Sequence, residues 1–279
     1  MELETQRFKP YDLGRYVDVM PRILQDGRTP VSVARVFDRR VRTSFADWMD
    51  NYFDTGDLAA ITYDGDEVRL VLTADNSGRA TEFGKIVLGW INPNEKLVDY
   101  SINLGTNERY AQLDGKEGVI EISRGELGKL NGLQTKREAS NSGGLRILLR
   151  HPDVVPAQFA YTGLFEETVP RIFSEYHKRF AQSEDEENVG AMGVYISGNS
   201  IVPKLKAFCV NGLGDRSSVL DSGNLGSRDA RLVGEAPVGQ KTVDPLEYRA
   251  RTSLDAGRGF EHRGRLWVPV GEDAGLKVQ

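Results

Sequence analysis

The sequence has few of the residues that form the commonest metal and thiol sites. It contains one cysteine, Cys209, and three histidines in 279 residues. One cysteine cannot form a disulfide within the chain or build a thiolate metal cluster, so we expect a reducing compartment. The histidines, His151, His177 and His262, are far apart in sequence, and a histidine zinc site would require the fold to gather them. We therefore predict no cofactor and no metal.

Long apolar runs are also missing. No run approaches the ~18 residues that a membrane helix needs, and the run at residues 144–149 is interrupted by Arg146. Residues 1–7 carry acidic side chains and no apolar segment, unlike a secretory signal. We therefore expect a cytoplasmic protein that does not span a membrane.

Familiar catalytic and nucleotide-binding motifs are absent as well. The sequence has neither a G-x-x-x-x-G-K-[ST] loop nor a complete G-x-G-x-x-G pattern, and it has no H-E-x-x-H or G-x-S-x-G motif. These absences argue against nucleotide binding through a P-loop or a Rossmann turn. They do not exclude enzymes in general, because many active sites are assembled from residues scattered in sequence.

Composition and charge indicate a globular chain. Hydrophobic residues make up 39% and charged residues 28%, a balance that allows a buried core and a wet surface. The length is close to twice the roughly 150 residues of a typical domain, so one large domain or two modest ones would fit. The net charge of −5 argues against a protein that coats nucleic acid over its whole surface, but it leaves room for a local basic stripe.

Three segments carry apolar residues at helical spacing and predict helices: residues 11–24, residues 30 to about 55, and residues 168–182. The second has the clearest start. Thr29 can cap its N-terminus, and Pro30 suits the first helical position because its missing N–H costs nothing there.

The middle of the chain has the shorter period of strands. Asp64-Gly65, between the β-rich runs 58–63 and 67–73, predicts a tight hairpin because glycine accepts the positive φ of such a turn. Further strands are expected at residues 86–91, 96–104, 119–122, 145–149, 191–196 and 202–210, the first two forming a second hairpin.

Together these elements predict an α+β fold with N-terminal helices, a largely antiparallel sheet core crossed by one long helix, and an extended C-terminal arm. The corresponding regions are residues 1–56, 57–210 and 211–279. The last region is rich in glycine and arginine and buries too little to fold by itself. Its large apolar residues are the predicted contacts with a neighbouring subunit: Val233, Leu246, Tyr248, Phe260, Leu266 and Trp267.

A possible basic stripe lies on the second predicted helix. Arg35, Arg39 and Arg42 fall within reach of one another, opposite its apolar face. Such a stripe could bind the phosphates of a nucleic acid. The alternative interpretation is a solvated helix face, which the neighbouring Asp38 favours.

One spaced pattern of charged residues suggests metal chemistry. Asp99, followed by Asp114 and Lys116, resembles the D…DxK pattern of the PD-(D/E)xK nucleases. The resemblance implies that the two carboxylates hold Mg²⁺ and that the lysine steadies the attacking water. The pattern is short and degenerate, and Asp114-Gly115 is also typical of a turn.

Two classes of function follow. The first is a non-enzymatic structural or assembly protein, a self-associating homo-oligomeric subunit of a larger, virus-like particle. The absence of catalytic signatures and the long C-terminal segment favour it. The second is a metal-dependent, nuclease-like enzyme that uses Asp99, Asp114 and Lys116. We favour the first.

Overall fold

A computed structural model gives the fold of most of the chain. It describes residues 7–11, 14–42, 48–49, 51–62, 66–105, 108–130, 141–171, 202–212, 220–223, 225–226 and 229–237, and strands at 260–262, 265–269 and 276–278. The chain divides into two compact units, Met1–Val238 and Gly239–Gln279, which are treated separately below.

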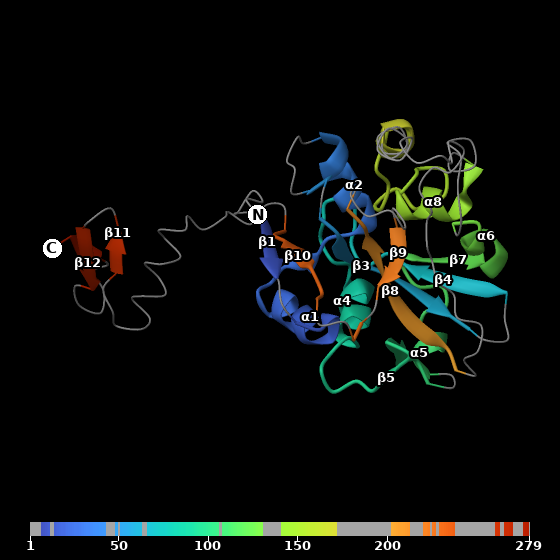
Figure 1. The fold of residues 1–279 in the computed structure, drawn as a ribbon, viewed down its shortest axis with the longest axis horizontal. Helices are drawn as coiled ribbons and strands as arrows, with labels where there is room; N and C mark the ends of the chain where they lie inside the picture. Colours follow the sequence, from blue (N-terminus) through green and yellow to red (C-terminus); the bar gives the residue numbers. More distant parts are fainter. Residues whose placement is uncertain are drawn as a thin grey trace, which may run out of the picture. The chain divides into compact units, whose positions relative to one another are not determined.

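A ten-stranded sheet forms the frame of the larger unit (Figure 1). Its strands are β1 Phe8–Tyr11, β2 Thr29–Pro30, β3 Phe53–Ile61, β4 Glu67–Val71, β5 Leu97–Val98, β6 Ser101–Asn103, β7 Val119–Ser123, β8 Lys204–Val210, β9 Leu220–Gly223 and β10 Leu232–Glu235. The main path runs β1-β10-β3-β8-β6-β5, with β2 beside β10, β4 between β3 and β7, and β9 beside β8. Since β10 runs parallel to β3 and the other pairs are antiparallel, the sheet is mixed.

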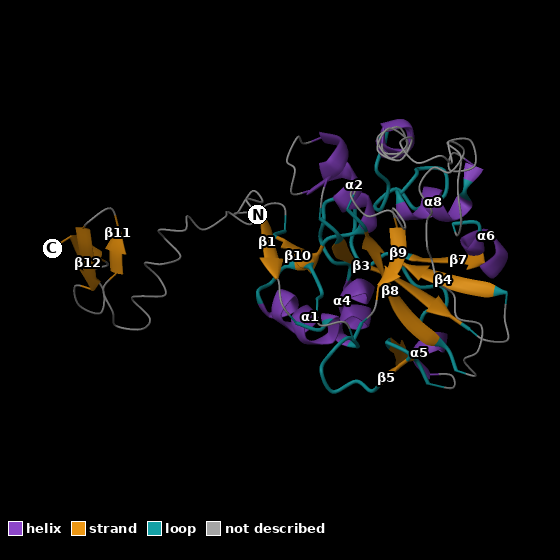
Figure 2. Cartoon of the chain, viewed as in Figure 1, coloured by secondary structure: helices purple, strands orange, loops and turns teal. Residues whose placement is uncertain are grey.

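Short helices accompany this sheet (Figure 2). They are α1 Tyr16–Gln25, α2 Val33–Arg42, α4 Glu82–Gly89, α5 Glu108–Ala111, α6 Arg124–Gly128 and α8 Gly143–Leu148. The expected mixture of helices and strands is therefore confirmed. The predicted long helix at residues 168–182 leaves the described part of the chain after residue 171, so its crossing of the sheet stays a prediction. No helix in the described residues is long and apolar enough to cross a membrane.

β3 is the central strand, and each of its nine residues is buried. It pairs with β4 from Leu58↔Val71 to Ile61↔Val68, which confirms the hairpin predicted around residues 64–66. The turn residue Gly65 lies outside the described residues. The strands predicted near 119–122 and 202–210 are likewise found as β7 and β8.

Two predicted strands, at residues 86–91 and 145–149, are wrong. Residues 82–89 form α4, whose N-cap Thr81 accepts a hydrogen bond from the Gly84 N–H, and residues 143–148 form α8, capped by Ser142. Short apolar runs suit a buried strand and a buried helix equally well, and here the capping hydroxyls favour the helix.

The start of α2 also differs from the prediction. Thr29 and Pro30 form β2 and pair with β10, so Thr29 is not the helix cap. The first turn is held by Ser32, whose hydroxyl accepts from the Arg35 N–H at 3.1 Å. The carboxylate of Asp57 accepts from the Val33 N–H at 2.9 Å, which ties the helix start to β3.

The sheet has an apolar core on each face. Phe53, Ala59 and Ile61 of β3 join one core, to which α2 and α8 contribute. Leu58 and Ala60 point to the other, which α1 and α4 cover. Alternate residues of a strand lie on opposite faces, so β3 is enclosed by helices on both sides.

The expected regional boundaries are corrected by the strand pairing. Residues 220–235 were assigned to an extended arm, but β9 and β10 belong to the main sheet. β1 and β2 pair with β10, so residues on both sides of position 56 share that sheet. In the smaller unit, β11 Phe260–His262, β12 Arg265–Pro269 and β13 Leu276–Val278 form an antiparallel three-stranded sheet, in place of a fully extended arm.

Candidate functional site

The three arginines of the predicted stripe are engaged inside the protein. Arg35 is buried, and its Nε and Nη1 donate to Glu235 at 2.9 Å and to Asp38 at 3.2 Å. The half-exposed Arg42 forms an ion pair with the same Asp38. The Arg39 guanidinium lies over the aromatic ring of Phe8, 5.2 Å from its centroid. The carboxylate of Asp38 thus joins two of the three arginines.

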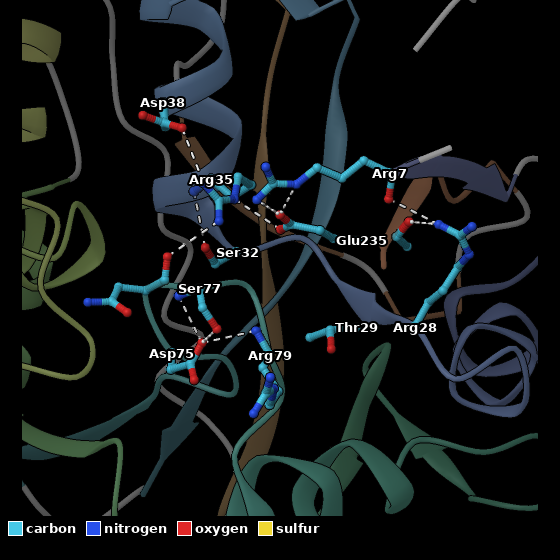
Figure 3. A network of polar contacts seen from close by, with 12 residues as sticks. Arg7, Arg28, Thr29, Ser32, Arg35, Asp38, Asp75, Ser77, Arg79 and Glu235 are labelled. Carbon is cyan, nitrogen blue, oxygen red and sulfur yellow. Dashed lines mark hydrogen bonds and ion pairs between the residues drawn. The ribbon is translucent and has the colours of Figure 1, made fainter. Parts of the chain in front are cut away.

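Glu235, on β10, is the centre of this arrangement (Figure 3). The residue is 1% exposed, and Arg7 donates to its Oε1 through Nε at 2.9 Å and Nη2 at 2.7 Å. Its Oε2 accepts from Arg35. Two guanidinium groups therefore neutralise one buried carboxylate, the condition under which a buried charge is tolerated. We call Arg7, Arg35, Asp38, Arg42 and Glu235 the Glu235 network.

A tight loop closes over the network. Asp75 Oδ1 accepts from the Ser77 N–H at 2.9 Å and from the Arg79 N–H at 3.0 Å (Figure 3). Between them Gly78 has φ +83°, and a Cβ there would lie 2.4 Å from Glu235 Oε2. Glycine is therefore required at this position by conformation and by space.

A second buried ion pair lies at the irregular part of β3. Between Asp54 and Leu58 the register with β8 shifts, so that Asp57 falls within an interruption of the ladder. Asp57 Oδ1 accepts from Arg150 Nη2 at 2.7 Å, and neither side chain reaches solvent. Arg150 has φ +62°, an uncommon conformation for a non-glycine residue. Burial raises the pKa of Asp57, and the Arg150 guanidinium opposes that rise.

The third group surrounds Asp54, which is 6% exposed. The Arg231 N–H donates to Asp54 Oδ2 at 2.9 Å. Burial raises the pKa of the Asp54 carboxyl to about 7, and this N–H opposes the rise. Asp54 is paired in the sheet with Cys209 of β8, whose Sγ lies 3.8 Å from Asn211 Oδ1. A carboxyl that titrates near neutral pH can exchange a proton under ordinary solution conditions.

No protein-family model and no curated protein matched the chain. In fold it is similar to a solved chain described as "Accommodation of massive sequence variation in Nanoarchaeota by the C-type lectin fold". The TM-score is 0.54 at 12% sequence identity, and the alignment covers 84% of this chain and 100% of that one. At this identity the likeness shows the fold alone.

The acidic residues of the D…DxK pattern have different partners on this C-type-lectin-like frame. Asp99, in the turn between β5 and β6, forms an ion pair with Lys204 of β8, and that hydrogen bond lowers the pKa of Asp99. Asp114 Oδ1 lies 3.8 Å from Nη2 of Arg69 on β4, and Lys116 lies in the loop before β7. In the described part of the chain, no group of three or more His, Cys, Asp or Glu residues could hold a metal ion.

The predicted interface residues fall into three places. Val233 is buried in β10 at 1% exposure, so the interface prediction is wrong for this residue. Leu246 and Tyr248 lie outside the described residues. Phe260 is in β11, and Leu266 and Trp267 are in β12 of the smaller unit.

Sequence reasoning missed Asp54, Asp57, Arg150 and Glu235. One signal was available, because Asp54 and Asp57 interrupt an otherwise apolar strand in the segment FDTGDLAAI. A charge within a buried strand must be paired or must shift its pKa. Arg150 and Glu235 give no comparable local signal, since their partners are far away in sequence.

Proposed function

We propose that this chain is a non-enzymatic structural or assembly protein, a self-associating subunit of a larger particle. The observation that carries the proposal is the separate C-terminal unit, Gly239–Gln279. Its size is near the ~40 residues below which a domain usually needs disulfides, a metal or oligomerisation. It has no cysteine and a single histidine, so self-association is the remaining source of stability within this class.

The register of the small sheet groups its apolar residues. Phe260 pairs with Trp267, and Trp267 pairs with Val278. Directly opposed residues of antiparallel strands share a face, as do residues two apart on one strand. The pair Pro269↔Leu276 therefore belongs to the same face, which we call the Trp267 face.

The opposite face is less apolar. Its pairs are Glu261↔Leu266 and Val268↔Lys277, so each apolar residue of β12 is opposed by a charge. Of the predicted interface residues, Phe260 and Trp267 thus lie on one face and Leu266 on the other. This difference supports docking through the Trp267 face.

The area of the Trp267 face suits a pair of identical sheets. Phe and Trp side chains bury roughly 150–250 Å² each. With three smaller apolar residues, two copies packed face to face could bury on the order of 1,200 Å² in total, the lower end of stable interfaces. A three-stranded sheet needs such a cover for independent stability.

The likeness in fold gives further support. The similar chain is described as accommodating massive sequence variation by the C-type lectin fold. We infer that the present chain uses its buried ion pairs in the same general way, to hold a frame while its surface meets partners. The Glu235 network and the Asp57–Arg150 pair lock that frame from within.

Light scattering of the full chain at several concentrations tests the proposal. We expect a mass above that of one chain, and a shift toward the monomer in a Phe260→Ala, Trp267→Ala double variant. Val268→Ala, on the opposite face, is the matched control and should keep the full mass. A monomer at every concentration, or unchanged assembly of the double variant, contradicts the proposal.

A further inference from the structure

We propose that the Asp54 carboxyl is a proton-controlled latch between β3 and β10, which holds the start of β10 closed when protonated and loosens it when ionised.

The junction between these strands is short. In the described residues β10 meets β3 at one paired position, Leu232↔Asp54, whereas β3 pairs with β8 at six positions. Two hydrogen bonds hold the neighbouring Arg231: the Asp54 N–H donates to its carbonyl at 2.9 Å, and its N–H donates to Asp54 Oδ2 at 2.9 Å. One of the two links therefore depends directly on a titratable side chain.

The surroundings of Asp54 include several polar groups. Its charged and titratable neighbours are Tyr16 of α1, Tyr52 and Asp57 near or on β3, Cys209 of β8, and Asp229 and Arg231 before β10. The Arg231 guanidinium bonds to Asn51 and lies 5.2 Å from the Tyr52 ring centroid. Asp57 is paired with Arg150. Within the described residues, Asp54 itself forms no ion pair.

These surroundings set the direction of the effect. A buried carboxyl without a cationic partner is more stable protonated, and burial raises the pKa of Asp54 to about 7. When the junction opens, the carboxyl meets water and returns toward its ordinary pKa of about 4. Linkage then makes opening about tenfold more favourable for each pH unit between these values, with a plateau above about pH 7.

The position of β10 in the chain gives the latch its consequence. The strand carries Glu235, whose carboxylate joins Arg7 and Arg35 across the network of Figure 3. It is also the last strand before the C-terminal unit in sequence. The latch does not depend on the proposed self-association, since every group in it lies in the larger unit.

Hydrogen–deuterium exchange of the full chain between pH 5 and pH 8, corrected for intrinsic exchange, tests the latch. We expect protection of the Arg231 and Leu232 amides to fall about tenfold per pH unit up to about pH 7. Asp54→Asn keeps an acceptor for the Arg231 N–H and should remove that slope. Amides of β4, such as Val68, serve as the internal control and should lack the Asp54-dependent part.

The same pH slope in the wild type and the Asp54→Asn variant overturns the latch, as does flat protection in the wild type. If Asp54→Asn does not fold, the carboxyl carbon shift of Asp54 can be followed by NMR in the wild-type chain. A midpoint near 7 supports the latch, and a midpoint near 4 overturns it.

Discussion

Asp57 and Arg150 form an ion pair 2.7 Å long that is closed to solvent on both sides, with side-chain exposures of 0% and 1%. The pair joins the irregular part of β3 to the segment after α8, 93 residues away. Asp57 also accepts from the Val33 N–H at the start of α2. One carboxylate therefore fixes three parts of the fold.

Removal of one partner should be costly. We expect Arg150→Met to lower the free energy of unfolding by about 3–5 kcal/mol, because the Asp57 charge would stay buried without its cation. The measurement is urea denaturation at neutral pH. The double variant Asp57→Asn, Arg150→Met should lose less than the single variant, since no lone charge is left. A double variant as unstable as the sum of the two single variants would contradict this account.

Gly78 provides a separate test of the Glu235 network. Gly78→Ala should destabilise the fold by roughly 1–3 kcal/mol, because φ is +83° and the new Cβ would press on Glu235. Gly27→Ala is the matched control, since Gly27 has φ +66° but a Cβ there would meet nothing within 4 Å. The difference between the two losses in thermal unfolding isolates the contact with Glu235. Equal losses would show that Glu235 does not constrain Gly78.

The sequence predicts local features of this fold better than long-range ones. The Asp64-Gly65 turn signal lies within a few residues of the strands that it joins, and those strands are found. The arginine at position 35 could be assigned neither to a solvated face nor to a ligand from sequence, because its main partner, Glu235, is 200 positions away. The same distance hides the membership of β10 in the sheet.

Capping residues carried information that hydrophobic pattern alone did not. Thr81 and Ser142 precede the apolar runs that form α4 and α8, and each side chain accepts a bond from the third following N–H. Thr29 offers the same signal but forms a strand, because β10 supplies its partner. A cap is therefore a good local indicator that tertiary pairing can override.

The nuclease-like alternative makes a prediction about magnesium. Asp99 is held by Lys204, and Asp114 lies beside Arg69, so these carboxylates have separate cations. We expect millimolar Mg²⁺ to leave the melting temperature unchanged and to produce no cleavage of single- or double-stranded DNA. Asp99→Asn and Asp114→Asn should behave alike in both assays. Mg²⁺-dependent cleavage that both variants lose would favour the enzyme alternative.

Global stability should depend on pH through Asp54. Its pKa in the folded chain is about 7, above the model value of 3.8, so the folded state binds the proton more tightly than the unfolded state. The stabilisation is complete below about pH 4, declines by about 1.4 kcal/mol per pH unit, and is lost above about pH 7. Over that window the loss is on the order of 4 kcal/mol.

Asp54→Asn removes this dependence and leaves the Arg231 N–H with an acceptor. Urea denaturation should therefore show similar stabilities for the variant and the wild type near pH 4.5, and a more stable variant at pH 8. The carboxylates with lowered pKa values, such as Asp18 and Asp26, act in the opposite direction and only at acid pH, so they do not produce this difference. A gap between variant and wild type that is the same at both pH values would show that Asp54 is ionised throughout.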